Sequence, residues 1–158
     1  MILLTLDIAT KTGWAFGASS HDLSFGSVTF DQKTLGARGA AFVAWLSGMI
    51  CEHHPGDVVF EAPVLPRKTA LATVRILSGL AFACETICFK KNIRCSEAHQ
   101  QTVRLFVAGR GNASKDDVAA AVSRLGYRPR NHDESDAIAL WLYSAHALGM
   151  DERLSISQ

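Results

Sequence analysis

The stretch Ile2-Leu-Leu-Thr-Leu-Asp7 decides the fold of this 158-residue chain. Its nearly continuous apolar run is typical of a strand that is buried on both faces of a sheet. A turn leads into Thr12-Gly-Trp-Ala-Phe-Gly17, and residues 23–30 then alternate apolar with polar side chains. The three segments predict three antiparallel strands, with Asp7 at the end of the first.

Helices and strands alternate along the rest of the chain. Residues 35–53 carry apolar side chains at helical spacing, and Asp57-Val-Val-Phe-Glu61 is a second apolar strand that ends in a carboxylate. We then expect a helix over 68–89, a strand over 93–96, a helix over 100–107, a helix capped by Ser114 and closed by Gly126, and a last helix from His132 to Leu148 that Gly149 stops. The order predicts one α/β domain over residues 1–158, built on a mixed five-stranded sheet flanked by helices.

The composition is that of an ordinary globular protein, with 48% hydrophobic and 20% charged residues. No apolar run reaches the roughly 18 residues of a membrane span. The chain starts directly into an apolar strand, without the basic segment and cleavage site of an export signal. We therefore expect a cytoplasmic protein with no membrane partner.

The formal net charge of +1 conceals a basic middle region, residues 62–132. Twelve Lys and Arg side chains stand there against four acidic ones. This excess favours a polyanionic partner, since Lys and Arg displace counterions from phosphates. Ordinary solvated helix faces would account for the same charges.

The four cysteines, Cys51, Cys84, Cys88 and Cys95, match no common zinc-site spacing. In a reducing cytosol they are predicted to be small core residues rather than disulfide partners. Cys84 and Cys88 share a predicted helix and two histidines lie near Cys51, so a zinc site is the less favoured alternative.

Four carboxylates are candidates for one metal site. Asp7 and Glu61 each end an apolar strand, and the ends of neighbouring parallel strands converge on the same rim of a sheet. Asp133 and Asp136 share one face of the first turn of the last helix. Crowded carboxylates repel one another unless a divalent cation neutralises them, and an all-oxygen site selects Mg²⁺ or Mn²⁺.

Each carboxylate also has a purely structural interpretation. Asp7 could cap the turn that follows it, and Glu61 could form a salt bridge with Arg67 or Lys68. Asp133 and Asp136 could serve only as an N-cap and as partners of the helix dipole.

Four motifs carry a family resemblance. They are Leu6-Asp-Ile-Ala-Thr-Lys-Thr-Gly-Trp-Ala15, then Phe60-Glu61, then Asn112-Ala-Ser-Lys115 before a helix, and finally Asp133-Glu-Ser-Asp-Ala-Ile-Ala-Leu140. In this order they resemble the motifs of the RuvC-type Holliday junction resolvases, over nearly the whole chain. The resemblance implies an RNase H-like fold and a homodimer built partly on the long central helix. It also implies paired cuts in four-way DNA junctions, in the cytoplasm of a bacterium, or of its host if the gene belongs to a phage.

The resemblance also suggests roles for the site residues. Catalysis would be two-metal hydrolysis with Mg²⁺, for which Mn²⁺ can substitute: Asp7 shared by both ions, Glu61 and Asp136 holding one each, and Asp133 completing the set. Lys115 is the best candidate to bind the scissile phosphate. Arg110, Arg67, Lys68 and Arg75 are expected to contact branched DNA, and His132 is a less favoured candidate for proton transfer.

Three positions depart from the family pattern, and the first is Ala9, where the family's first motif usually has glycine. Val64 or Leu65 stands where family members carry an aromatic residue, and Gln100 stands where a lysine is common. Three alternatives therefore stay open: an RNase H-like nuclease that cuts flaps or RNA–DNA hybrids, a non-catalytic structure-specific DNA-binding protein, and a phosphotransferase of the actin and sugar-kinase fold. The last needs two lobes, for which this chain is short.

Overall fold

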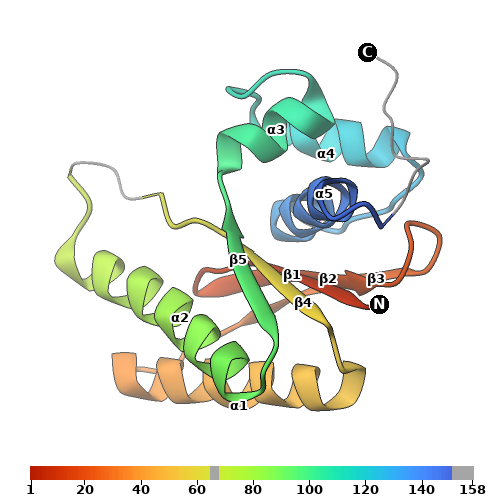
Figure 1. Ribbon diagram of the computed structural model, residues 1–158. Helices are drawn as coiled ribbons and strands as arrows, with labels where there is room; N and C mark the ends of the chain where they lie inside the picture. Colours follow the sequence, from red (N-terminus) through yellow and green to blue (C-terminus); the bar gives the residue numbers. More distant parts are fainter. Residues whose placement is uncertain (65–67, 151–158) are drawn as a thin grey trace.

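The computed structural model describes residues 1–64 and 68–150, which form a mixed sheet with strand order β3-β2-β1-β4-β5 (Figure 1). Strands β1 (Leu3–Asp7), β2 (Lys11–Gly17) and β3 (Leu23–Thr29) are antiparallel neighbours, whereas β4 (Asp57–Glu61) and β5 (Arg94–Ala98) run parallel to β1. The expected mixed five-stranded sheet is therefore confirmed.

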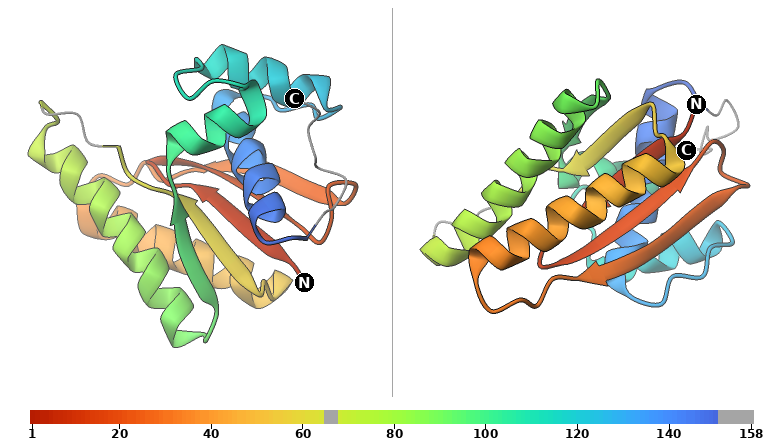
Figure 2. Two further views of the ribbon diagram at one scale, coloured as in Figure 1. Left: turned by 45° about the horizontal axis from the view of Figure 1, so that its top comes forward. Right: turned by 90° about the horizontal axis from the view of Figure 1, so that it is seen from below.

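Within the described residues, five helices cover the sheet on its two faces. Helices α1 (Leu35–His53) and α2 (Leu71–Lys90) lie on one face, and α3 (Gln100–Ala108), α4 (Lys115–Arg124) and α5 (His132–Ala147) lie on the other (Figures 1 and 2). Several bounds differ slightly from the sequence expectation. Helix α2 spans Leu71–Lys90 rather than 68–89, α3 ends at Ala108 rather than at 107, and α5 ends at Ala147 rather than at 148.

Alternate residues of β1 face two separate hydrophobic cores. Leu3 belongs to the core under α3, α4 and α5, whereas Leu4 and Leu6 belong to the core under α1 and α2. Successive side chains of a strand point to opposite faces, so a strand between two helical layers must be apolar at nearly every position. This is why the opening run of the chain predicted a doubly buried strand.

Buried polar contacts fasten α5 to the sheet. The indole Nε1 of Trp141 donates to the carbonyl of Leu3 at 3.2 Å. The hydroxyl of Thr5 lies within hydrogen-bond distance of the carbonyls of Ala137, at 3.0 Å, and Ala15, at 3.3 Å. These bonds hold the middle of α5 over β1, the strand that ends in Asp7.

Helix α2 is long and apolar enough, by length and composition, to cross a bilayer. Polar and charged residues, among them Arg75 and Glu85, interrupt this helix, so it is not a continuous apolar run. In the fold, α2 packs the side that carries Leu80, Cys84 and Ile87 into the core that it shares with α1. Only 28% of the most apolar stretch of α2 is buried within the protein, so much of the apolar surface of this helix is exposed.

The prediction that the cysteines are core residues is confirmed for Cys84 and Cys88 and is wrong for Cys51. Cys84 and Cys88 are fully buried, and Cys95 is half-buried. Cys51 is exposed on α1 rather than part of the core. All four are free thiols.

Candidate metal centre

Asp7 and Glu61 lie side by side at one edge of the sheet. Strands β1 and β4 are parallel neighbours, with Leu6 opposite Phe60, so the carboxylates that follow in each strand emerge together. Burial raises the pKa of Asp7 to about 8, and the charges of Glu61 and Asp136 add to this rise. A carboxyl group in this state holds its proton near neutral pH unless a cation replaces it.

Asp133 and Asp136 approach from α5, above the same edge. The N-cap of this helix is Asn131, whose side chain accepts a hydrogen bond from the Glu134 amide at 2.9 Å. The interpretation of Asp133 as the N-cap is therefore wrong. Asp136 is buried, and burial raises its pKa although the nearby Lys115 opposes the rise.

All three other carboxylates act on Asp7. Glu61, Asp136 and Asp133 each raise its pKa through their negative charge. The turn after Asp7 is closed by Thr12, whose hydroxyl donates to the Ala9 carbonyl at 2.8 Å, so this turn is held without a cap from Asp7. The structure thus brings together the four carboxylates that the sequence singled out.

Glycine at position 13 lets α5 approach the sheet. A Cβ on Gly13 would stand less than 3.0 Å from the carbonyl carbon and oxygen of Asp133, and near the Cβ of Ala137. Any side chain on β2 at this point would push away the turn that carries two of the carboxylates. The Thr-Gly pair of the first motif therefore has a steric role in assembling the site.

Glu61 is oriented by a residue that sequence reasoning treated only as a departure. The side-chain amide of Gln100, at the start of α3, donates to Oε1 of Glu61 at 2.8 Å. Burial raises the pKa of Glu61, and the hydrogen bond from Gln100 opposes this rise. Lys68 forms no ion pair with Glu61 in the described ranges, and Arg67 lies outside them.

Two lysines face the two aspartates of α5. Lys115 Nζ lies 3.4 Å from Asp136 Oδ2, and Lys11 Nζ lies 3.0 Å from Asp133 Oδ2. Burial lowers the pKa of Lys115, but the charges of Asp136 and Asp7 outweigh this and raise it overall. Lys11 was missed by sequence reasoning, although it stands inside the first motif, four residues after Asp7.

The position of Lys115 is set by the loop before it. Arg104 of α3 donates to the carbonyl of Ala113 at 2.8 Å. Ser114 then caps α4 in a reciprocal pair with Asp117, as the sequence predicted. Lys115 therefore lies in a first helical turn that is held by the Arg104 bond to the preceding loop and by the Ser114 cap.

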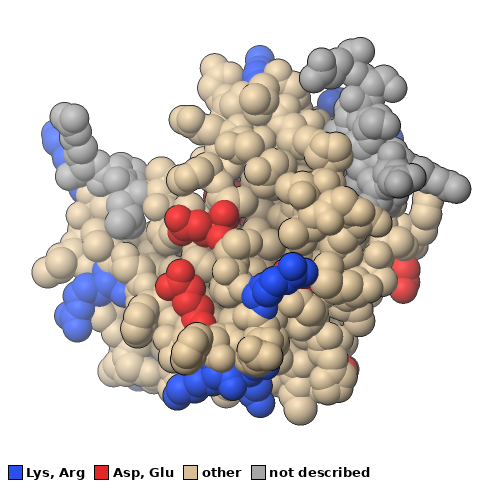
Figure 3. Space-filling view, in the orientation of Figure 1, with Lys and Arg blue, Asp and Glu red and all other residues tan. Residues whose placement is uncertain are grey.

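The other basic residues expected to contact DNA lie in different surroundings. Arg110 pairs with Asp117 at 2.6 Å, whereas Lys68 and Arg75 are both exposed and Arg67 lies outside the described residues. On the face shown in Figure 3, Lys and Arg side chains lie in separate groups with acidic side chains between them. The basic middle of the sequence therefore forms no continuous patch on that face.

His132 lies at the start of α5 but faces α4. Its Nε2 lies 3.1 Å from a carboxylate oxygen of Asp116, which is exposed. A role in proton transfer at the metal centre stays the less favoured prediction for this histidine.

The donor set of this site consists of oxygen atoms. Carboxylates that repel one another in a partly dry place favour a hard divalent cation, which removes the repulsion. Burial first, and repulsion between the carboxylates second, raises the pKa values of Asp7, Glu61 and Asp136, and a bound cation would offset both effects. The residues present therefore fit a divalent metal centre.

Known proteins are similar to this chain in sequence. No family model matches it. A crossover junction endodeoxyribonuclease RuvC of Zymomonas mobilis is 30% identical over 154 residues, which cover 92% of this chain and 91% of that protein. The RuvC of Granulibacter bethesdensis is 27% identical over 143 residues, covering 85% and 79%.

Solved structures agree on the fold. Thermus thermophilus RuvC in complex with a Holliday junction substrate superposes with a TM-score of 0.79 at 21% identity, covering 95% of this chain and 96% of that one. The yeast mitochondrial Holliday junction resolvase Ydc2 gives 0.64 at 8% identity, covering 87% and 75%. With its RNase H-like sheet and its full-length similarity to curated relatives, the chain belongs to the RuvC family of crossover junction endodeoxyribonucleases.

Proposed function

We propose that this protein is a divalent-metal-dependent endonuclease that resolves four-way DNA junctions, with Asp7, Glu61, Asp133 and Asp136 as the metal ligands. The observation that carries the proposal is the convergence of these four carboxylates from β1, β4 and α5, where burial and their mutual repulsion raise the pKa of Asp7 to about 8. Membership of the RuvC family supports the junction as substrate.

Bound divalent ions would activate water for phosphodiester hydrolysis and stabilise the charge that develops on the phosphate. Other residues of the chain would position the metal ligands and bind the phosphate. Gln100 orients Glu61, and Gly13 allows α5 to bring Asp133 and Asp136 over the sheet edge. Lys115 carries a positive charge beside Asp136 and is suited to bind the scissile phosphate.

We propose Mg²⁺ as the physiological ion, with Mn²⁺ able to substitute, because both are hard cations that prefer oxygen ligands. A bacterial enzyme that acts on DNA would work in the cytoplasm. Cleavage assays in which Mg²⁺, Mn²⁺ and Ca²⁺ are compared at equal concentration test the choice of ion.

Substitution of Asp7 tests the catalytic assignment. Asp7→Asn keeps the side-chain shape but removes the charge, so it should abolish metal-dependent cutting of a synthetic four-way junction while junction binding persists. Asp116→Asn is the matched control, because Asp116 is exposed and pairs with His132 outside the cluster. Undiminished cleavage by Asp7→Asn would overturn the assignment.

The same assay separates the alternative functions. A flap, an RNA–DNA hybrid and a four-way junction are offered in parallel, and we expect the junction to be cut preferentially. A purely structure-specific binding protein would bind the junction equally in EDTA and in Mg²⁺ and release no product. The phosphotransferase alternative is wrong, since the chain belongs to an endonuclease family.

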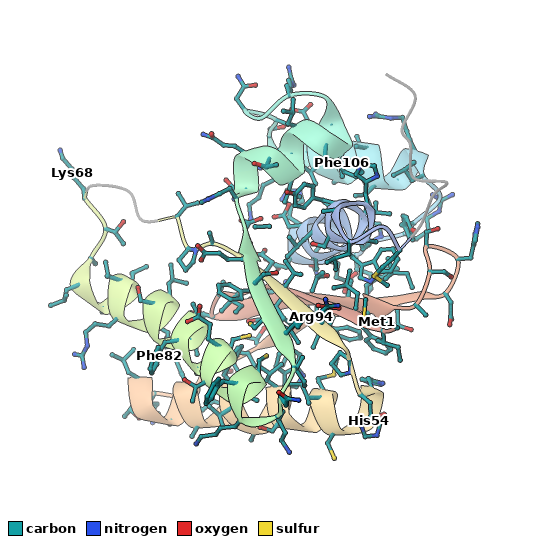
Figure 4. All side chains as sticks on the ribbon, in the orientation of Figure 1. Met1, His54, Lys68, Phe82, Arg94 and Phe106 are labelled. Carbon is teal, nitrogen blue, oxygen red and sulfur yellow. The ribbon has the colours of Figure 1, made fainter. Side chains whose placement is uncertain are left out.

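Four basic residues outside the metal site are proposed to bind DNA phosphates: Arg67, Lys68, Arg75 and Arg110. Lys68 projects from the segment before α2 (Figure 4), and Arg75 stands in the first half of that helix. Lys68→Ala or Arg75→Ala removes one positive charge from the DNA interface, so either variant should weaken junction binding and reduce its salt dependence. Lys91→Ala, an exposed lysine at the far end of α2, is the control.

We propose that the protein is a homodimer that pairs through α2. Leu71, Phe82 and Phe89 are 73%, 70% and 87% exposed, respectively. Their spacing of 11 and 7 residues places them on one side of the helix. Figure 4 labels Phe82 on this helix. A symmetric partner that presents the same stripe would cover it, and two copies would account for paired cuts.

Sedimentation or light scattering tests the dimer. Phe82→Glu puts a charge into the stripe and should yield monomers that still fold. Leu105→Glu is the control, because Leu105 is also an exposed apolar residue but lies on α3. A monomeric wild-type protein would contradict the proposal.

A further inference from the structure

Three thiols from two elements converge on the face of the sheet away from α5. Cys84 and Cys88 lie four residues apart on α2, and Cys95 lies on β5. Their three Sγ atoms are all within 4.8 Å of one another. Across the described ranges, this is the one group of three or more His, Cys, Asp or Glu side chains whose ligand atoms gather so closely.

The cluster combines a closed interior with one open side. Cys84 and Cys88 are fully buried in the core between α1, α2 and the sheet, whereas Cys95 is half-buried. An ion could therefore reach the sulfur atoms past Cys95 and be held away from bulk water. The other free cysteine, Cys51, is exposed on α1 and lies outside the group.

The donor atoms of the cluster are three cysteine sulfur atoms. A thiolate is the form of cysteine that binds metals, so an ion bound here would displace the thiol protons. Soft sulfur ligands of this kind select ions such as Zn²⁺ and Cu⁺ over Mg²⁺.

We propose that Cys84, Cys88 and Cys95 form a three-thiolate site for a thiophilic d¹⁰ metal ion, Zn²⁺ or Cu⁺, that is separate from the carboxylate centre. Metal binding replaces the thiol protons, so up to one proton leaves each sulfur. The ion links the second half of α2 to the edge strand β5. It would thereby stabilise the fold without taking part in cleavage.

The two candidate ions differ in how they would complete the site. Cu⁺ is satisfied by three thiolates, whereas Zn²⁺ prefers four ligands and would add a water molecule on the open side at Cys95. Titrating the reduced, oxygen-free protein with each ion separately distinguishes them. Excess Mg²⁺ is kept present so that the carboxylate centre is already occupied.

The experiment measures metal content after desalting and the melting temperature. We expect about one tightly held ion per chain and a higher melting temperature for the wild type and for Cys51→Ser. Cys95→Ser should lose both effects. A folded Cys95→Ser protein that retains the full metal content, or a wild type that retains neither ion, would overturn the proposal.

A second measurement requires no substitution. Alkylation followed by mass spectrometry should show that the bound ion protects Cys95 while Cys51 reacts at an unchanged rate. Equal reactivity of Cys95 with and without the ion would overturn the proposal. Cleavage of a four-way junction by Cys95→Ser should equal that of the wild type, so this test is independent of the proposed nuclease mechanism.

Discussion

Gly13 of β2 packs so closely against the backbone of Asp133 that no side chain fits between them. A Cβ at position 13 would stand less than 3.0 Å from the Asp133 carbonyl group. The contact joins the first motif of the chain to the last. It sets how far α5 can descend on the sheet, and so it sets the distance between the carboxylates on α5 and those that end β1 and β4.

Gly13→Ala should therefore impair both stability and cleavage. The added methyl group overpacks a rigid backbone contact, at a cost of about 1–3 kcal/mol. Displacement of Asp133 and Asp136 should reduce cleavage further than this decrease in stability explains. Gly48→Ala is the control. Gly48 lies on α1, where an added Cβ would meet no other atom within 4 Å, and alanine favours a helix. Melting curves and single-turnover cleavage of both variants test the expectation, and wild-type cleavage by Gly13→Ala would contradict it.

The carboxylate cluster should make the metal-free protein less stable as pH rises. Burial raises the pKa of Asp7 from 3.8 to about 8, and it raises those of Glu61 and Asp136 as well. Between about pH 4 and pH 8 the folded state thus keeps protons that the unfolded state has released, so the free energy of unfolding falls over this range. Each pKa unit corresponds to about 1.4 kcal/mol.

Melting temperatures in EDTA from pH 5 to pH 8 measure this effect. We expect a decline for the wild type, a shallower one for Asp7→Asn, and recovery at pH 8 when Mg²⁺ is added, because the ion takes the place of the protons. Identical pH profiles for the wild type and Asp7→Asn would show that Asp7 does not destabilise the fold in this way.

Gln100 should act as a positioning residue for Glu61. Gln100→Ala removes the hydrogen bond of 2.8 Å and leaves the carboxylate free to rotate. Removal of such a supporting group typically costs about 10–100-fold in metal affinity or activity. We therefore expect a higher Mg²⁺ concentration for half-maximal cleavage, with partial recovery at high Mg²⁺. Gln101→Ala alters the exposed neighbour on α3 and should leave the Mg²⁺ dependence unchanged.

Lys115 should matter more for cleavage than for binding. Its ammonium group lies 3.4 Å from Asp136 Oδ2, where it can reach a phosphate at the metal site. Lys115→Ala should lower the single-turnover cleavage rate about 100-fold or more, as expected for removal of a group that stabilises transition-state charge. Junction affinity should fall only slightly. An equal decrease in rate and affinity would show that Lys115 only anchors the DNA.

Removal of the Lys11 side chain provides a comparison. Lys11 pairs with Asp133 at 3.0 Å and is more weakly connected to the cluster, since Lys115 rather than Lys11 is the cation that lowers the pKa of Asp7. Lys11→Ala should therefore reduce the cleavage rate less than Lys115→Ala. The same rate for both variants would contradict this ranking.

The sequence by itself determined the elements and the chemistry. Apolar runs that end in Asp7 and Glu61 indicated two buried strands with carboxylates at their ends, because side-chain alternation and burial are local properties of a strand. The capping pair of Ser114 and Asp117 and the helix from His132 were equally local. The motif order indicated the family, which the relatives then confirmed.

Only the tertiary structure decided how the residues of the site support one another. Gln100 holds Glu61, Lys11 faces Asp133, and the three thiols converge across α2 and β5. These pairs are distant in sequence or lack a periodic pattern, so no local rule could join them. Asn131 rather than Asp133 caps α5 for a similar reason: both residues have good capping side chains, and the backbone path set by the packing of α5 on β2 decides which one is used.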